Sequence, residues 1–154
     1  MVGLIILDVY GTLIKADKAD DVIRPGLEEF LEYYKKSSIV VFSDGEIAAV
    51  EFDLSQAGLN GRFVKIYGSE HLDERKLKNL ELITTELSIP KNKTRFIGDN
   101  AGNKDYCSAK RYGIPFIKIP QFRERIPSSE EPVYDKHVKY ETKPFTFVSL
   151  MGRL

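Results

Sequence analysis

The feature that most limits the fold of this chain is a set of short, nearly unbroken apolar runs spaced along its first 120 residues. Runs with so little polar alternation are typical of strands buried on both faces of a parallel sheet. They lie at Leu4–Leu7, Ile39–Phe42, Phe63–Ile66, Arg95–Ile97 and Phe116–Ile119.

Four segments with apolar residues at helical spacing separate or follow these runs. They extend from Leu27 to Tyr34, from Ile47 to Ala57, from Leu80 to Leu87 and from Lys104 to Tyr112. Gly58 and Gly113 follow the second and fourth segments, where a glycine commonly ends a helix. Strand and helix in alternation predict an α/β fold, with a three-layer, Rossmann-like open parallel sheet flanked by helices.

The alternation stops at Pro120, so we expect a catalytic core over residues 1–120 and a C-terminal extension over residues 121–154. The extension is rich in proline and polar residues, and it ends in an apolar patch. The patch consists of Phe145, Phe147, Val148 and Leu150. We expect this segment either to pack on the core or to form an interface, and an interface would make the protein a homo-oligomer.

Charge and cysteine content exclude several classes of function. Lys and Arg together number 23, as do Asp and Glu, so no net field steers the protein toward nucleic acid or a membrane surface. The single cysteine, Cys107, fits a reducing compartment. The longest apolar stretch near the N-terminus, Leu4–Leu7, is too short for a membrane span or a signal sequence. We therefore expect a cytoplasmic protein.

Polar residues follow the apolar runs where parallel strands bring reactive groups to one edge of a sheet. Asp8 follows the first run, Ser43 and Asp44 follow the second, and Asp99 follows the fourth with Asp105 close behind. Two carboxylates held together repel each other unless a cation or a proton lies between them. Hard oxygen ligands favour magnesium. The pattern therefore predicts a Mg²⁺ site shared by Asp8 and Asp99.

The same edge offers groups that could receive an anionic oxygen. Thr12, Ser43 and the backbone amides at the start of the second helix are suitable donors. Lys76 lies in the segment before the third predicted helix, and in the first turn of a helix its charge would oppose the helix dipole. A residue that breaks a local rule beside a strand-edge cleft often has a function. Together these groups indicate phosphoryl chemistry with a carboxylate nucleophile.

These motifs resemble those of the haloacid dehalogenase superfamily over roughly residues 1–119. Residues 8–13, Asp-Val-Tyr-Gly-Thr-Leu, are similar to its first motif, and residues 96–100, Phe-Ile-Gly-Asp-Asn, to its fourth. Ser43 at the end of a strand resembles the second. The third motif, a lysine that opens a helix, matches least well: Lys76 is the first choice, without the family's flanking prolines, and Lys78 is the alternative.

The resemblance implies roles for individual residues. Asp8 would be the nucleophile and form an aspartyl phosphate. The main-chain carbonyl of Tyr10 and the carboxylate of Asp99 would complete the protein's ligands to magnesium. Asp105 stands one residue later than the commonest spacing, so it would be either a metal ligand or a residue that orients the ligands.

In the same way, Ser43, the backbone amide of Asp44 and Lys76 would hold the phosphoryl oxygens.

Tyr10 departs from the pattern of the superfamily's phosphatases, which have an aspartate here that protonates the leaving group. The tyrosine resembles the dehalogenase branch, whose members carry a helical cap domain inserted soon after the first motif. Here only the segment Ile14 to Ile23 separates that motif from the next helix, so the chain is nearly capless. Capless members tend to accept large or macromolecular phosphate substrates, or to borrow a lid from a neighbouring subunit.

The sequence thus predicts a magnesium-dependent hydrolase of phosphate monoesters, acting on a phosphorylated small molecule or macromolecule. It would be slow or specialised, because general acid catalysis is worth about 10²–10⁴ in rate. Two alternatives remain open. One is a hydrolase resembling the 2-haloacid dehalogenases, and the other is a non-catalytic binding protein on the same fold.

Overall fold

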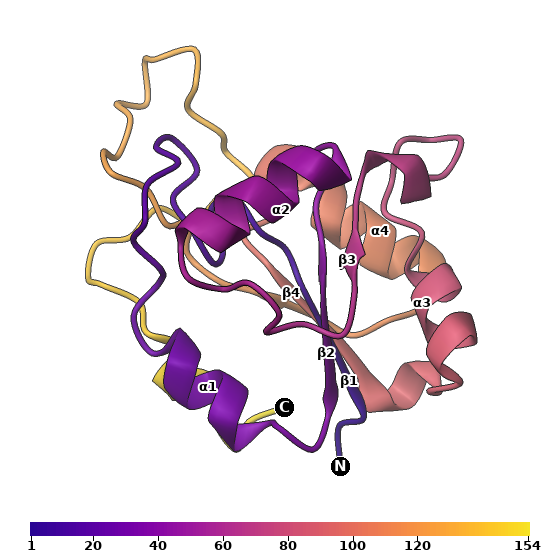
Figure 1. The fold of residues 1–154 in the computed structure, drawn as a ribbon. Helices are drawn as coiled ribbons and strands as arrows, with labels where there is room; N and C mark the ends of the chain where they lie inside the picture. Colours follow the sequence, from indigo (N-terminus) through magenta and orange to yellow (C-terminus); the bar gives the residue numbers. More distant parts are fainter.

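The computed structural model describes all residues 1–154 and contains one parallel sheet of five strands in the order β3-β2-β1-β4-β5 (Figure 1). The strands are β1 (Leu4–Leu7), β2 (Ser38–Phe42), β3 (Ile66–Tyr67), β4 (Thr94–Gly98) and β5 (Phe116–Lys118). The predicted run at Phe63–Ile66 overlaps its strand only at Ile66. β3 lies at the sheet edge, and the side chain of Val64 is exposed there.

Four α-helices lie within the predicted segments and cover both faces of the sheet (Figure 1). They are α1 (Leu27–Tyr33), α2 (Ile47–Gln56), α3 (Leu80–Leu87) and α4 (Lys104–Tyr112). Short 3-10 turns occur at Ser69–His71, Lys91–Lys93, Ala101–Asn103 and Phe147–Leu150. None of the helices has the length and apolar character needed to cross a membrane. The predicted three-layer α/β fold is confirmed.

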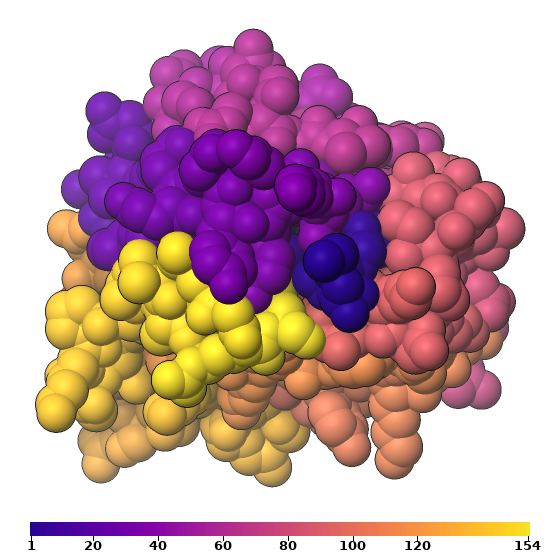
Figure 2. Space-filling view, turned by 90° about the horizontal axis from the view of Figure 1, so that it is seen from below, coloured from indigo at the N-terminus to yellow at the C-terminus, as the bar shows by residue number.

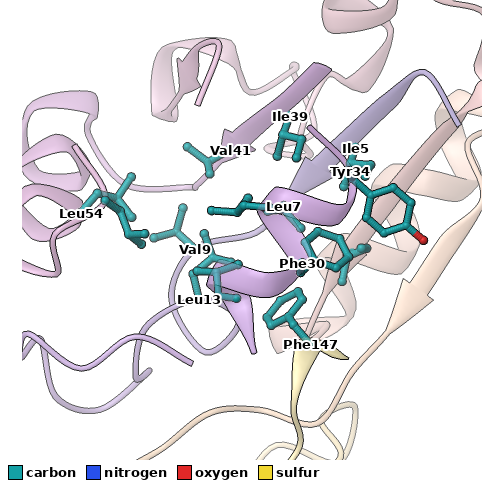
Figure 3. Packing of buried hydrophobic residues seen from close by; sticks show 14 of the residues in the cluster. Ile5, Leu7, Val9, Leu13, Phe30, Tyr34, Ile39, Val41, Leu54 and Phe147 are labelled. Atoms are coloured by element: carbon teal, nitrogen blue, oxygen red, sulfur yellow. The ribbon is translucent and has the colours of Figure 1, made fainter. Parts of the chain in front are cut away.

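The position of β1 at the centre of the sheet explains why its sequence has no polar alternation. All four of its residues are fully buried. Ile5 and Leu7 pack in the cluster that includes α1 and α2, as Figure 3 illustrates, whereas Leu4 and Ile6 pack in the cluster that includes α3 and α4. A strand with apolar partners on both sides must be apolar at every position.

The C-terminal extension folds back along the core. Its last part lies against α1 and beside the N-terminus, at the end of the molecule opposite the strands' carboxyl ends (Figures 1 and 2). Phe147 is fully buried, and its ring meets that of Phe30 edge to face at 5.1 Å. Phe145 and Leu150 pack against the same cluster, and only Val148 of the apolar patch is exposed. Self-association stays a prediction, but this patch no longer supports it.

Replacing Phe147→Ala should lower the free energy of unfolding by about 3–5 kcal/mol, because it removes a fully buried ring and leaves a cavity against α1. The measurement is equilibrium unfolding in urea. Val148→Ala is the matched control. Val148 is the exposed neighbour of Phe147, and its replacement should change the free energy of unfolding by less than about 0.5 kcal/mol. Similar values for both variants would mean that the extension does not belong to the core.

Candidate active site

The site lies where the adjacent strands β1 and β4 end. Leu7 is level with Ile97 in the parallel register, and the amide of Asp8 donates to the carbonyl of Ile97 at 3.0 Å. Asp8 and Asp99 therefore leave neighbouring strands at the same edge. A β-carbon at Gly98 would lie 2.4 Å from Oδ2 of Asp105, so only glycine lets these segments approach so closely.

Three buried carboxylates meet at this edge. Asp8, Asp99 and Asp105 each offer an oxygen, and these oxygens all lie within 4.8 Å of one another. Asp105 comes from the first turn of α4. The backbone amide of Asn100, in the loop before that helix, donates to Oδ2 of Asp105 at 3.2 Å and holds the carboxylate in place. The structure thus brings together the three aspartates that the sequence singled out.

The lysine of the site is Lys78 and not Lys76. Nζ of Lys78 lies 2.8 Å from Oδ1 of Asp8 and 2.9 Å from Oδ1 of Asp105, and its side chain is only 4% exposed. Lys76 is exposed in a turn, with φ of 63°. The expectation that Lys76 opens a helix was wrong, because the Asp73 carboxylate accepts backbone N–H groups and holds a turn there. α3 begins only after Asn79, which caps it.

Burial and the neighbouring charges shift the ionisation of this cluster. Burial raises the pKa of Asp8 to about 7, against the opposing effect of the Lys78 ammonium. Burial also raises the pKa of Asp105 to about 6. For Lys78 burial acts to lower the pKa, but the charges of Asp105 and Asp8 outweigh it and the net shift is upward. Lys78 therefore stays charged and is the cluster's built-in cation.

Asp99 carries the clearest sign that the site suits a cation. Its Oδ2 accepts a hydrogen bond from Nε2 of Gln121 at 2.7 Å, whereas its Oδ1 is buried and has no partner. A buried carboxylate oxygen without a partner is costly, and a bound cation would satisfy it. The available ligands are all hard oxygens, which suit Mg²⁺. The residues present therefore fit the metal that the sequence predicted.

The side chain of Tyr10 is engaged elsewhere. Its hydroxyl donates to Oδ2 of Asp53 on α2 at 2.5 Å. Burial and this hydrogen bond raise the pKa of Tyr10 above its ordinary value. The hydroxyl proton is thus committed to Asp53. The carbonyl oxygen of Tyr10 accepts no backbone hydrogen bond, and its role as a metal ligand stays a prediction.

The predicted phosphate-binding residues take different positions. Ser43 is 2% exposed at the end of β2, and its Oγ accepts from the amide of Gly45 at 3.1 Å, so its own hydroxyl proton stays available. The carboxylate of Asp44 is partly exposed and lies 3.9 Å from Nζ of Lys104. The hydroxyl of Thr12 donates to Oδ2 of Asp8 at 3.1 Å. Thr12 therefore orients Asp8, since its only proton is already used.

Two further residues of the site escaped the sequence analysis. Asn100 has a positive φ of 68°, a conformation that asparagine tolerates better than most residues, and its side chain accepts from the amide of Tyr106 at 2.8 Å. Its position next to Asp99 in the fourth motif was the available signal. Gln121 gave none, because its place beside Asp99 depends on how the extension folds.

Comparison with known proteins agrees with this arrangement. A family model described as haloacid dehalogenase-like hydrolase matches residues 5–119. No curated protein sequence matches the chain. Several solved structures are similar in fold.

One is a haloacid dehalogenase-superfamily hydrolase of subfamily IA from Geobacter sulfurreducens, at 13% identity and a TM-score of 0.66, covering 80% of this chain and 94% of that one. A second, from Haemophilus somnus, is titled a predicted phosphoglycolate phosphatase; it has 14% identity and a TM-score of 0.64, covering 82% of this chain and 89% of that one. A third is a haloacid dehalogenase-like family hydrolase from Xanthomonas campestris, at 13% identity and a TM-score of 0.63, with coverages of 93% and 91%.

The cluster predicts that magnesium stabilises the protein more at pH 8 than at pH 5. Burial raises the pKa of Asp8 to about 7, so the native state binds more protons than the unfolded state between pH values of about 4 and 7. The stability that those protons give is lost as the pH rises through this range. Mg²⁺ then takes their place as the counter-charge. The measurement is the melting temperature with and without magnesium chloride at both pH values.

Comparing the two magnesium conditions at one pH cancels the contribution of carboxylates outside the site with lowered pKa, such as Asp73. Asp99→Asn is the control variant, because it weakens the metal site and should abolish most of the magnesium effect. An equal rise in melting temperature at pH 5 and pH 8 would contradict the assignment.

Proposed function

The chain belongs to the family of haloacid dehalogenase-like hydrolases, and we propose that it is a magnesium-dependent phosphatase that hydrolyses phosphate monoesters through an aspartyl phosphate on Asp8. The observation that carries this proposal is the gathering of Asp8, Asp99 and Asp105 around the buried ammonium of Lys78. Such a site combines a nucleophile with fixed positive charge for a dianionic substrate.

In the first step the Asp8 carboxylate attacks phosphorus, and the bond from phosphorus to the alcohol oxygen breaks. The electron pair of that bond leaves with the alcohol oxygen. Thr12 and Lys78 hold the two oxygens of Asp8, which fixes the direction of attack. In the second step water attacks the phosphorus of the acyl phosphate, which releases inorganic phosphate and restores the Asp8 carboxylate.

The phosphoryl oxygens need donors, and the chain supplies them from the segment before α3 and from the end of β2. Two hydrogens of the Lys78 ammonium point to Asp8 and Asp105, so the third is available to a phosphoryl oxygen. The Ser43 hydroxyl and the backbone amide of Asp44, at the end of β2, serve the other oxygens. These are the kinds of group that the family resemblance assigned to the phosphoryl oxygens, with Lys78 in place of Lys76.

The metal would be held by Asp8, by Oδ1 of Asp99 and by the Tyr10 carbonyl. When bound, Mg²⁺ supplies positive charge that offsets the substrate's negative charge during transfer. The two oxygens of Asp105 accept from Lys78 and from the amide of Asn100, which ties this carboxylate to the lysine and to the loop after β4. We assign Asp105 the task of orienting Lys78.

The substrate is a phosphorylated small molecule or macromolecule. The chain has no sizeable cap, and the loop at residues 14–23 and the extension lie beside the sheet edge that holds the site. A structural neighbour's title as a phosphoglycolate phosphatase supports the phosphatase class and not a particular substrate.

Lys78→Met should lower kcat/KM for acetyl phosphate by about 10²–10³, the loss typical of removing one donor to a developing oxyanion. Lys76→Met is the matched control and should behave as the native protein, since Lys76 is exposed outside the site. Phosphate release under saturating magnesium measures both, with circular dichroism to check folding. Loss of activity in Lys76→Met alone would return the role to Lys76.

The position of Tyr10 predicts a steep dependence on the leaving group. Its proton is held by Asp53, so alkyl phosphates, whose alcohols need a proton, should react far more slowly than aryl or acyl phosphates. Tyr10→Phe should keep this dependence, and Tyr10→Asp should flatten it by supplying an acid. The measurement is a leaving-group series for the three proteins.

Preference of the native enzyme for alkyl esters would show that the acid comes from another residue. Halide release from 2-haloacids, together with no phosphate release from any ester, would favour the dehalogenase alternative.

A further inference from the structure

A residue of the C-terminal extension reaches the metal ligands. Gln121 is 6% exposed, and its Nε2 donates to Oδ2 of Asp99 at 2.7 Å. The other oxygen of that carboxylate, Oδ1, is the buried atom without a partner. Gln121 thus occupies one side of the carboxylate and leaves the other side bare.

Resting on the proposed function, we propose that Gln121 is a positioning residue of the magnesium site, which turns Asp99 so that its Oδ1 faces the ion. Partners behind a metal ligand fix its orientation, and their loss commonly weakens metal binding. Gln121 lies outside residues 5–119, the part that matches the family model. The extension therefore contributes to the site rather than only covering α1.

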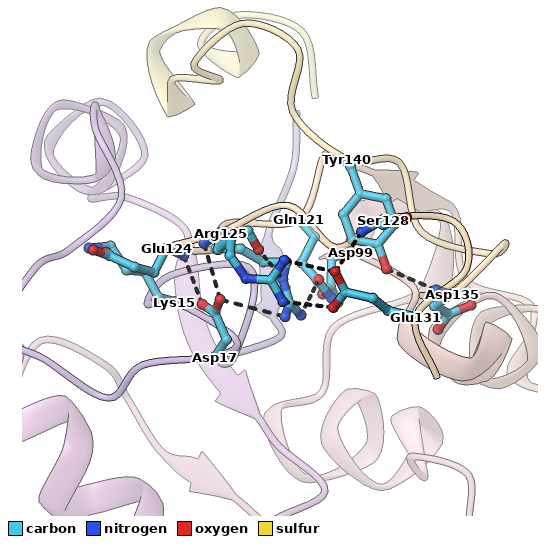
Figure 4. A network of polar contacts seen from close by, with 11 residues as sticks. Lys15, Asp17, Asp99, Gln121, Glu124, Arg125, Ser128, Glu131, Asp135 and Tyr140 are labelled. Atoms are coloured by element: carbon cyan, nitrogen blue, oxygen red, sulfur yellow. Dashed lines mark hydrogen bonds and ion pairs between the residues drawn. The ribbon is translucent and has the colours of Figure 1, made fainter. Parts of the chain in front are cut away.

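The orientation of the Gln121 amide follows from its second neighbour. NH1 of Arg123 donates to Oε1 of Gln121 at 3.1 Å. A guanidinium has donors and no acceptor, so the amide oxygen must face Arg123 and the amide nitrogen must face Asp99. NH2 of Arg123 lies in turn 3.5 Å from Oδ2 of Asp17, in the loop after β1. A polar chain from Asp17 to Asp99 results, which Figure 4 shows in part.

The backbone of the extension is tied to the same loops. The amide of Gln121 donates to the carbonyl of Lys139, and the amide of Phe122 donates to the carbonyl of Gly11, both at 2.8 Å. A β-carbon at Gly11 would lie 2.2 Å from Oδ2 of Asp99 and 3.0 Å from Cγ of Gln121. The loop after β1, the end of β4 and the extension therefore close around one carboxylate.

Further along, the carboxylate of Asp135 accepts from the amide of Gly102 at 2.6 Å. The extension thus contacts the loop that follows Asp99 as well as the loop that follows Asp8. Both loops that supply metal ligands are joined by one segment, and Gln121 is the point where this segment touches a ligand.

The test compares Mg²⁺ binding, by titration calorimetry, to the native full-length protein and to Gln121→Leu. The variant removes the donor to Asp99 at similar size, and we expect its dissociation constant for Mg²⁺ to rise by about 10- to 100-fold. Gln56→Leu, the same change at an exposed position of α2, is the matched control and should bind as the native protein does. Asp99→Asn marks the loss of the site.

A second readout separates positioning from a general structural role. The kcat of Gln121→Leu should approach the native value at high magnesium, while the magnesium concentration giving half of that rate increases. Damage to the fold would lower kcat at every magnesium concentration. Where Gln121→Leu does not fold, Arg123→Met decides the question, because it frees the amide without touching Asp99; weaker Mg²⁺ binding supports the proposal, and native binding overturns it.

The outcomes also separate this inference from the proposed function. Native affinity in Gln121→Leu, with binding lost in Asp99→Asn, would overturn the role of Gln121 and leave the phosphatase proposal standing. A native protein that binds no Mg²⁺ would overturn both.

Discussion

The repulsion among three buried carboxylates is the constraint on which the rest of this site depends. Asp8, Asp99 and Asp105 lie too close to be ionised together without positive charge among them. Lys78 supplies one charge and contacts two of the three. The third carboxylate has Gln121 on one side and a bare oxygen on the other. The proposed substrate and metal chemistry both rest on this incomplete compensation.

The fold creates this crowding through its strand order. β1 and β4 are far apart in the sequence but adjacent in the sheet, and their parallel register places Asp8 and Asp99 at one edge. Because the interior of β1 is apolar on both faces, its first polar residue marks the end of the strand and the beginning of the site. Core packing thus sets the position of Asp8, the proposed nucleophile.

The sequence was sufficient to predict the strands, helices and site residues that follow from local periodicity. It failed for residues whose positions depend on contacts between distant segments. Continuous apolar runs located four of the five strands, whereas the run at Phe63–Ile66 met β3 only at Ile66; Asp8 and Asp99 followed from the ends of two such runs. The choice between Lys76 and Lys78 could not be made in this way, because the Asp73 carboxylate holds a turn around Lys76, and the place of Lys78 depends on its contacts with the distant Asp8 and Asp105. Gln121 depends on long-range folding of the extension, for which no periodic pattern exists.

The two glycines at the site, Gly11 and Gly98, have a consequence for how such a chain can vary over generations. Every single-nucleotide change in a glycine codon that alters the residue adds at least a β-carbon. At Gly98 that atom would collide with the Asp105 carboxylate, and at Gly11 with the Asp99 carboxylate. Replacement of the residue is therefore blocked at both positions, although neither glycine contributes a functional group.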